Sequence, residues 1–142
     1  MKNGGVEWKV LSVLIIDDSK TTRELIRSML HQIGVTNTFE AQNGEQALGP
    51  KRAVLEVVDL VICDWNLPGM SGLEVLKHVR SFSSVKAFLM VTGRCDVPSI
   101  VEAREAGVSG YISKPFSITR LKTQIETVFK PKHASQNQSG AE

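Results

Sequence analysis

The sequence has few cysteines, few aromatic residues and almost no net charge. Its two cysteines, Cys63 and Cys95, form neither a disulfide framework nor a Cys-X-X-Cys metal motif. A formal charge of +2 is too small for a nucleic-acid-binding face, so we expect no direct contact with nucleic acid. No apolar run reaches the roughly 18 residues that a membrane-spanning helix needs. The sequence therefore predicts a cytoplasmic protein without membrane attachment.

The composition is that of one globular domain. With 42% hydrophobic and 23% charged residues among 142, the chain can bury a sizeable core. We expect an N-terminal extension over residues 1–9 and one domain over residues 10–130. Residues 131–142 are polar and small, which predicts a disordered tail.

Short apolar runs rich in β-branched residues alternate with longer amphipathic stretches. The runs predict strands near residues 10–16, 36–41, 58–64, 87–91 and 109–113. The amphipathic stretches predict a helix after each strand. Gly49-Pro50 should break or kink the second helix, because proline lacks an N–H donor and clashes with the preceding turn. This alternation predicts an α/β fold, a parallel sheet with helices on both faces.

The first of these helices shows the clearest apolar pattern. Five residues are predicted to share its buried face, with Gly34 ending the helix: Leu25, Ile26, Met29, Leu30 and Ile33. Ser19 can open the helix as its N-cap, which leaves the two preceding aspartates free for another role.

Polar side chains follow four of the predicted strands, at the point where each strand ends. From the first strand to the fifth they are Asp17 and Asp18, Asp64 and Asn66, Thr92, and Lys114 with Pro115. Each has an ordinary interpretation on its own, as a helix cap, a turn residue or a surface lysine. In an open parallel sheet, however, the carboxyl ends of the strands form the edge where ligands bind. Their common position therefore predicts a functional site.

The residue types in this set favour a phosphoryl group bound beside a metal ion. Three clustered carboxylates repel one another unless a cation is present, and carboxylate oxygens are ligands that Mg²⁺ prefers. The Lys114 ammonium and the Thr92 hydroxyl would favour an anion with several oxygens. The set contains no histidine, serine or cysteine placed as a nucleophile, so the central carboxylate, Asp64, is the candidate. The product would be an acyl phosphate on Asp64.

The stretches around these residues resemble the receiver domain of response regulators. They read LIIDDS, VICDWNLPGMSGLEVL, MVTG and AGVSGYISKPF, in the order and spacing of that family, across residues 10–129. CDWNLPGMSGLE and SGYISKPF are similar to stand-alone, chemotaxis-type regulators in particular. The resemblance implies a flavodoxin-like, doubly wound fold with five parallel strands in the order 2-1-3-4-5.

The resemblance also implies roles at the phosphorylation site. Asp64 would accept a phosphoryl group from a histidine kinase or a histidine phosphotransfer protein. Asp17, Asp18, Asp64 and the backbone carbonyl of Asn66 would bind Mg²⁺. The protein would be a signalling protein that catalyses only its own phosphorylation and dephosphorylation.

Further residues would form a switch in such a protein. Lys114 would pair with a phosphoryl oxygen, and the Lys114–Pro115 peptide bond would be cis. Thr92 would move towards the phosphoryl group, and Tyr111 would swing inward. A downstream protein would bind the surface of the fourth helix, fifth strand and fifth helix. We expect a monomer or a weak dimer.

Three alternatives remain open at this point. A Mg²⁺-dependent phosphohydrolase with an aspartyl nucleophile would usually carry an acid two residues after Asp64, where this chain has Asn66. A flavodoxin-like cofactor binder would need a hydroxyl- and glycine-rich phosphate loop where Asp17 and Asp18 stand. Arg94, two residues after Thr92, could attract the phosphoryl charge or point to water.

Overall fold

Five parallel strands run through the middle of the molecule in the order β2-β1-β3-β4-β5. The structure is a computed structural model and describes residues 5–94 and 96–130, so the predicted tail over 131–142 lies outside the described residues. The strands are β1 (Ser12–Ile16), β2 (Asn37–Ala41), β3 (Leu60–Asp64), β4 (Ala87–Thr92) and β5 (Gly110–Ser113). The predicted fold class and strand order are confirmed.

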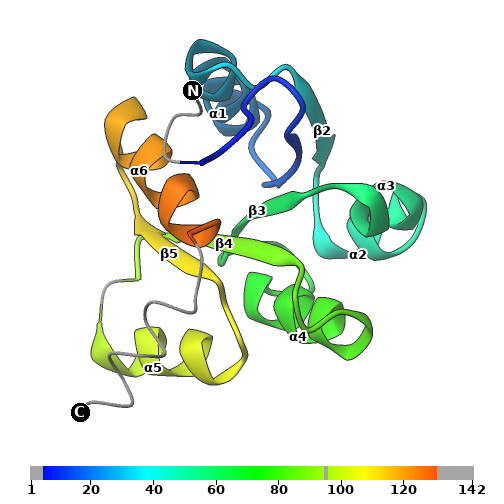
Figure 1. The fold of residues 1–142 in the computed structure, drawn as a ribbon. Coiled ribbons are helices and arrows are strands. Elements are labelled where there is room, and N and C mark those ends of the chain that lie inside the picture. Colours follow the sequence, from blue (N-terminus) through cyan, green and yellow to red (C-terminus); the bar gives the residue numbers. More distant parts are fainter. Residues whose placement is uncertain (1–4, 95, 131–142) are drawn as a thin grey trace.

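Helices connect the strands and cover both faces of the sheet (Figure 1). They are α1 (Lys20–Ile33), α2 (Gly44–Leu48), α3 (Arg52–Val57), α4 (Gly72–Phe82), α5 (Val97–Glu105) and α6 (Ile118–Val128). The predicted break at Gly49-Pro50 is confirmed, since it separates α2 from α3. The helices expected as the fourth and fifth are therefore α5 and α6.

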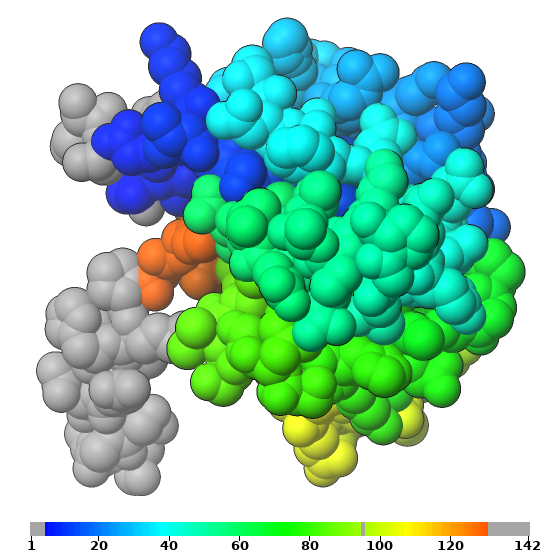
Figure 2. All heavy atoms as spheres, turned by 90° about the vertical axis from the view of Figure 1, so that its right-hand side faces the viewer, coloured from blue at the N-terminus to red at the C-terminus, as the bar shows by residue number. Residues whose placement is uncertain are grey.

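The core has two halves, one on each face of the sheet. Along β1, Val13 and Ile15 point into the half under α1 and α6, whereas Leu14 and Ile16 point into the half under α2, α3, α4 and α5. β3 and β4 are buried along their whole length, which matches their continuous apolar sequences. Figure 2 views the second face, where α2 and α3 lie beside α4. This packing fixes the ends of β1, β3 and β4, which carry the candidate site.

Helix α1 begins and ends as predicted, but its buried face is rotated about the helix axis relative to the predicted one. The Ser19 hydroxyl accepts a hydrogen bond from the Thr22 N–H, and Gly34 ends the helix with φ of 124°. Its buried residues are Arg23, Ile26 and Leu30, at spacing i, i+3 and i+7. The prediction that Leu25 is buried is wrong: it is 54% exposed, because it lies beside this face.

The N-terminal extension contributes to the core. Val6 and Trp8 are buried in the half under α1 and α6, although they precede β1. A Cβ at Gly34 would lie 3.1 Å from the Cβ of Trp8, so the extension packs closely against the end of α1. No helix in the described part of the chain is long and apolar enough to cross a membrane.

Candidate functional site

The ends of β1 and β3 bring three carboxylates together. Asp17, Asp18 and Asp64 each offer one oxygen, and these oxygens all lie within 4.8 Å of one another. Asp17 is 2% exposed and Asp64 is 7% exposed, whereas Asp18 lies at the surface. Two buried carboxylates this close together cost free energy unless a positive charge compensates them.

Asp17 is held through three of its four polar groups. Its N–H donates to the Ala41 carbonyl over 3.1 Å, and its carbonyl accepts from the Arg23 guanidinium over 2.7 Å. Its Oδ1 accepts from the Ser19 N–H over 2.8 Å. Its Oδ2 is buried and has no hydrogen-bond partner among the described residues. A hard cation such as Mg²⁺ would satisfy this oxygen, so the donor set fits that metal.

Asp64 is held between the chain that follows it and the lysine that follows β5. Its Oδ1 accepts from the Asn66 N–H over 3.1 Å. Its Oδ2 lies 3.0 Å from the Lys114 Nζ, which is also 3.6 Å from Oδ2 of Asp17. One ammonium group therefore faces both buried carboxylates.

These contacts shift the pKa of two groups. Burial raises the pKa of Asp17 above its ordinary value; the Ser19 hydrogen bond opposes this, the charge of Asp64 adds to it, and the charge of Lys114 opposes it. Burial lowers the pKa of Lys114, but the hydrogen bond to Asp64 and the charges of Asp64 and Asp17 outweigh burial and raise it overall. Lys114 therefore remains an ammonium ion, able to bind an anion.

A hydroxyl and a guanidinium from the end of β4 lie beside two aromatic rings, Trp65 after β3 and Tyr111 in β5. Thr92 is fully buried, and its Oγ1 accepts from the Arg94 N–H over 2.9 Å. The Arg94 guanidinium lies 5.1 Å from the Trp65 ring centroid and 3.4 Å from Oδ1 of Asn66. The Tyr111 hydroxyl donates to the Arg94 carbonyl, and its ring meets Trp65 edge to face at 6.4 Å. Arg94 thus contacts site residues from the exposed rim.

The backbone around the site is closely packed. A Cβ on Gly72 would lie 2.2 Å from the carbonyl oxygen of Asp64, so only glycine lets α4 begin directly against the end of β3. The Lys114 N–H donates to the Thr92 carbonyl over 2.9 Å, which joins the ends of β5 and β4. The Lys114–Pro115 peptide bond is cis.

The residues selected from the sequence lie at the carboxyl edge of the sheet, except Tyr111, which lies within β5 opposite Met90 and beside Trp65. Sequence reasoning missed Arg23, whose buried guanidinium contacts Asp17. The sequence did indicate this position, because Arg23 stands at helical spacing (i, i+3 and i+7) with the apolar residues Ile26 and Leu30. Cys63, at the end of β3 next to Asp64, is a small core residue, and burial raises the pKa of its thiol well above the ordinary value.

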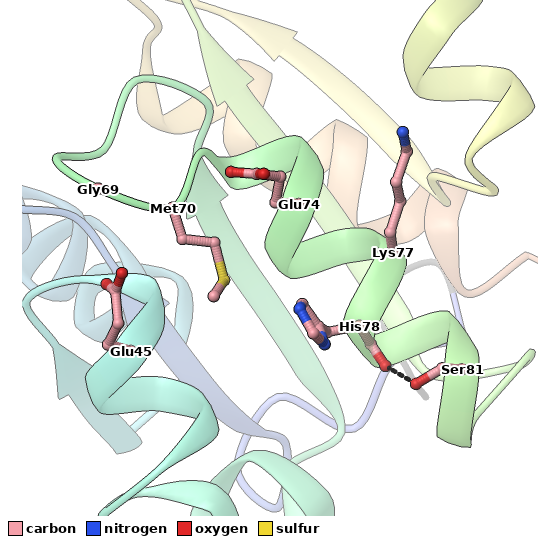
Figure 3. A pocket seen from close by; sticks show the side chains of 7 residues that line it. All are labelled: Glu45, Gly69, Met70, Glu74, Lys77, His78 and Ser81. Carbon is pink, nitrogen blue, oxygen red and sulfur yellow. Dashed lines mark hydrogen bonds between the residues drawn. The ribbon is translucent and has the colours of Figure 1, made fainter.

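A pocket of about 570 Å³ lies apart from this cluster, between α2, α4 and the loop that joins β3 to α4. Figure 3 shows Glu45 on α2 and His78 on α4 on opposite sides of it. Glu74 is engaged in capping α4, where its carboxylate accepts from the Ser71 N–H over 2.9 Å. The pocket contains none of the residues that converge at the strand ends.

Comparison with known proteins agrees with this geometry. The family model of the response regulator receiver domain matches residues 13–126. The chemotaxis protein CheY of Pseudomonas aeruginosa is 40% identical over 122 residues, which cover 84% of this chain and 97% of that protein. CheY-3 of Vibrio cholerae is 38% identical over 124 residues, or 86% and 94%. The high-resolution structure of the chemotaxis response regulator CheY4 of Vibrio cholerae superposes with a TM-score of 0.75 at 30% identity, covering 84% of this chain and 98% of that one.

The matched segment begins in β1 and ends in α6, so it contains the sheet except for Ser12, and all of the acidic cluster. It leaves out the buried Val6 and Trp8. On the extent of this match and the identity to its relatives, the chain belongs to the response regulator receiver family.

Proposed function

We propose that this chain is a response regulator controlled by phosphorylation of Asp64. The observation that carries the proposal is the position of the Lys114 ammonium, 3.0 Å from Oδ2 of Asp64 and facing the acidic cluster. This arrangement offers a carboxylate nucleophile beside a fixed cation and a second cation site. The donor is a phosphohistidine of a histidine kinase or of a histidine phosphotransfer protein.

The transfer exchanges one bond to phosphorus for another. A carboxylate oxygen of Asp64 attacks, the phosphorus–nitrogen bond of the phosphohistidine breaks, and the imidazole leaves with the bonding electrons and takes up a proton. Lys114 binds a phosphoryl oxygen and stabilises the charge that spreads over these oxygens in the transition state. Because its ammonium already faces Asp64, it needs little reorganisation at that moment.

The metal ligands are Asp17, Asp18, Asp64 and the backbone carbonyl of Asn66. The Oδ2 of Asp17 supports this assignment: it is buried, accepts no hydrogen bond from the described residues and has the Lys114 ammonium only at 3.6 Å, so a bound cation would compensate it. Bound Mg²⁺ would neutralise charge on the carboxylates and on the phosphoryl oxygens. The chain's own part is to hold these oxygens in place before the metal arrives.

Thr92 and Tyr111 transmit the change to the surface formed by α5, β5 and α6. The Thr92 hydroxyl turns from the Arg94 N–H towards a phosphoryl oxygen, and Tyr111 moves inward. Val97 and Val101, one turn apart on α5, are exposed and support an apolar contact of this helix with a downstream protein.

The pathway is a chemotaxis-type two-component system of the cytoplasm, in which the protein acts as a monomer or a weak dimer. The names of the relatives from Pseudomonas aeruginosa and Vibrio cholerae support the pathway. A phosphohydrolase is not favoured, because the position two residues after Asp64 holds Asn66 instead of an acid.

The test is intact-protein mass spectrometry after incubation with MgCl₂ and acetyl phosphate. We expect the wild type to gain one phosphoryl group, and Asp64→Asn to gain none. No gain on the wild type, or an equal gain on the variant, would contradict the proposal. Rapid hydrolysis of unrelated phosphomonoesters would favour the phosphohydrolase instead.

A further inference from the structure

Arg23 is a buried cation next to a cluster of carboxylates, yet it pairs with none of those three carboxylates. It lies one turn into α1 and is 8% exposed. Its Nη1 donates to the backbone carbonyl of Asp17 over 2.7 Å, a bond that is itself buried. Burying a guanidinium costs free energy unless its hydrogen bonds are made, so this position constrains the side chain strongly.

The carbonyl that Arg23 binds belongs to the peptide unit between the two adjacent aspartates of the cluster. A peptide unit is planar, so fixing the Asp17 carbonyl also fixes the amide nitrogen and the Cα of Asp18. The N–H and the Oδ1 of Asp17 are already held by Ala41 and Ser19. Arg23 therefore supplies the contact that sets the direction of one aspartate relative to the other.

Arg23 is itself held by an acidic residue on the edge strand β2. Its Nε lies 2.8 Å from Oε1 of Glu40, whose side chain is 31% exposed. The backbone carbonyl of Glu40 accepts from the Lys51 Nζ over 2.7 Å, which ties β2 to the start of α3. Arg27 also reaches Glu40, at 3.5 Å, but it is more exposed and has no contact with Asp17 among the hydrogen bonds and ion pairs described.

We propose that Arg23 is a positioning residue for the cation site, holding the Asp17–Asp18 peptide in the orientation that lets both carboxylates bind one metal ion. The proposal rests on the proposed function, because it assumes that Asp17 and Asp18 bind Mg²⁺. It assigns the buried guanidinium a role through the backbone instead of through charge. Groups that orient metal ligands in this way typically change metal affinity by about tenfold or more when they are removed.

The direction in which Mg²⁺ affinity changes when Arg23 is replaced distinguishes a positioning role from an electrostatic one. A guanidinium near a divalent cation repels it, so a purely electrostatic role predicts that removing the positive charge strengthens Mg²⁺ binding. A positioning role predicts weaker binding, because the freed peptide can turn and the two carboxylates lose their common geometry. A purely structural role predicts lower stability with unchanged affinity in the folded protein.

The experiment titrates MgCl₂ into the full chain at constant ionic strength and follows the intrinsic tryptophan fluorescence. Trp65 adjoins Asp64 and reports on the site, whereas Trp8 lies near the other end of α1. Arg23→Gln should weaken Mg²⁺ affinity about tenfold. Arg23→Lys keeps the charge but loses the planar guanidinium that reaches two acceptors, so it should also weaken Mg²⁺ affinity. Arg27→Gln is the matched control: it removes a charge from the same helix and an ion pair with the same Glu40, but no contact with Asp17, so it should bind as the wild type does.

Each variant is measured well below its unfolding temperature, so that a loss of stability does not register as a loss of affinity. Unchanged or tighter Mg²⁺ binding by both Arg23 variants would overturn the inference, as would an equal loss in Arg27→Gln. If Arg23→Gln does not fold, Arg23→Lys decides alone. Asp17→Asn tests the metal site separately from the role of Arg23. If the wild type binds Mg²⁺ and this variant does not, the metal site is supported whatever the Arg23 variants do. Absence of saturable binding by the wild type would overturn the proposed function itself.

Discussion

The Nζ of Lys114 lies 3.0 Å from Oδ2 of Asp64, although 50 residues separate them in the chain. The lysine follows β5 and the aspartate ends β3, and β4 lies between these strands in the sheet. The contact therefore spans the end of β4, next to the buried Thr92. It places a cation where a phosphoryl group on Asp64 would carry its negative charge.

Removing this cation should slow phosphorylation. Lys114→Met loses the hydrogen bond to Asp64 and the charge that stabilises the transferring oxygens, so the rate of phosphoryl gain from acetyl phosphate should fall about 100-fold. The rate is measured from the mass of the intact protein over time. Lys77→Met, on the exposed side of α4, is the control and should react at the wild-type rate. An unchanged rate in Lys114→Met would exclude the proposed role of this lysine.

Neutralising Asp17 should stabilise the metal-free protein. Burial and the charge of Asp64 raise the pKa of Asp17, so its charged form destabilises the fold at neutral pH. Asp17→Asn keeps the oxygen that accepts from Ser19, and we expect about 0.5–2 kcal/mol more unfolding free energy, with Mg²⁺ binding lost. Denaturant unfolding in EDTA provides the measurement.

The pH dependence of this gain has a definite sign. Because the pKa of Asp17 is raised in the folded protein, the folded state takes up the proton at a higher pH than the unfolded state does. The wild type therefore gains stability relative to Asp17→Asn as the pH falls through the raised pKa. The difference should be largest near neutral pH and vanish in acid. A difference that grows in acid would contradict this account.

A side chain at Gly72 should disturb the end of β3. A Cβ there would lie 2.2 Å from the Asp64 carbonyl oxygen, so α4 must move away. We expect Gly72→Ala to lower the free energy of unfolding by roughly 1–3 kcal/mol, as overpacking does. Gly93→Ala is the matched control, since a Cβ at that position meets nothing within 4 Å. Equal stability of the two variants in urea would show that α4 accommodates the methyl group.

The N-terminal extension should stabilise the fold without affecting the metal site. Trp8 is 6% exposed and packs against Gly34, where α1 ends, whereas the acidic cluster lies where α1 begins. Trp8→Ala should cost about 3–5 kcal/mol of unfolding free energy. At a temperature where the variant is folded, its Mg²⁺ affinity should equal that of the wild type. A weaker affinity would mean that the extension also shapes the site.

Much of this molecule could be predicted from its sequence because the decisive signals are local. Buried parallel strands are continuously apolar, as in β3, and Gly49-Pro50 cannot continue a helix. The candidate site followed from the parallel arrangement of the strands, since residues after parallel strands meet at one edge of the sheet. Asp17, Asp64 and Lys114 could therefore be brought together before any distance was known.

Features that depend on contacts between distant segments could not be predicted in this way. The pairing of Arg23 with the Asp17 carbonyl and with Glu40 depends on how α1 is rotated over β1 and β2. The apolar pattern of α1 placed Leu25 on the buried face, because spacing alone does not locate the centre of that face. The burial of Trp8 depends on an extension that follows no periodic pattern.

The most direct test of the account is to locate the phosphoryl group chemically. The protein is incubated with acetyl phosphate, with and without MgCl₂, then reduced with borohydride, which converts an aspartyl phosphate to homoserine, and analysed by peptide mass spectrometry. The account predicts homoserine at position 64 alone and only when MgCl₂ is present. Homoserine at another aspartate, or none at position 64 in the presence of MgCl₂, would contradict it.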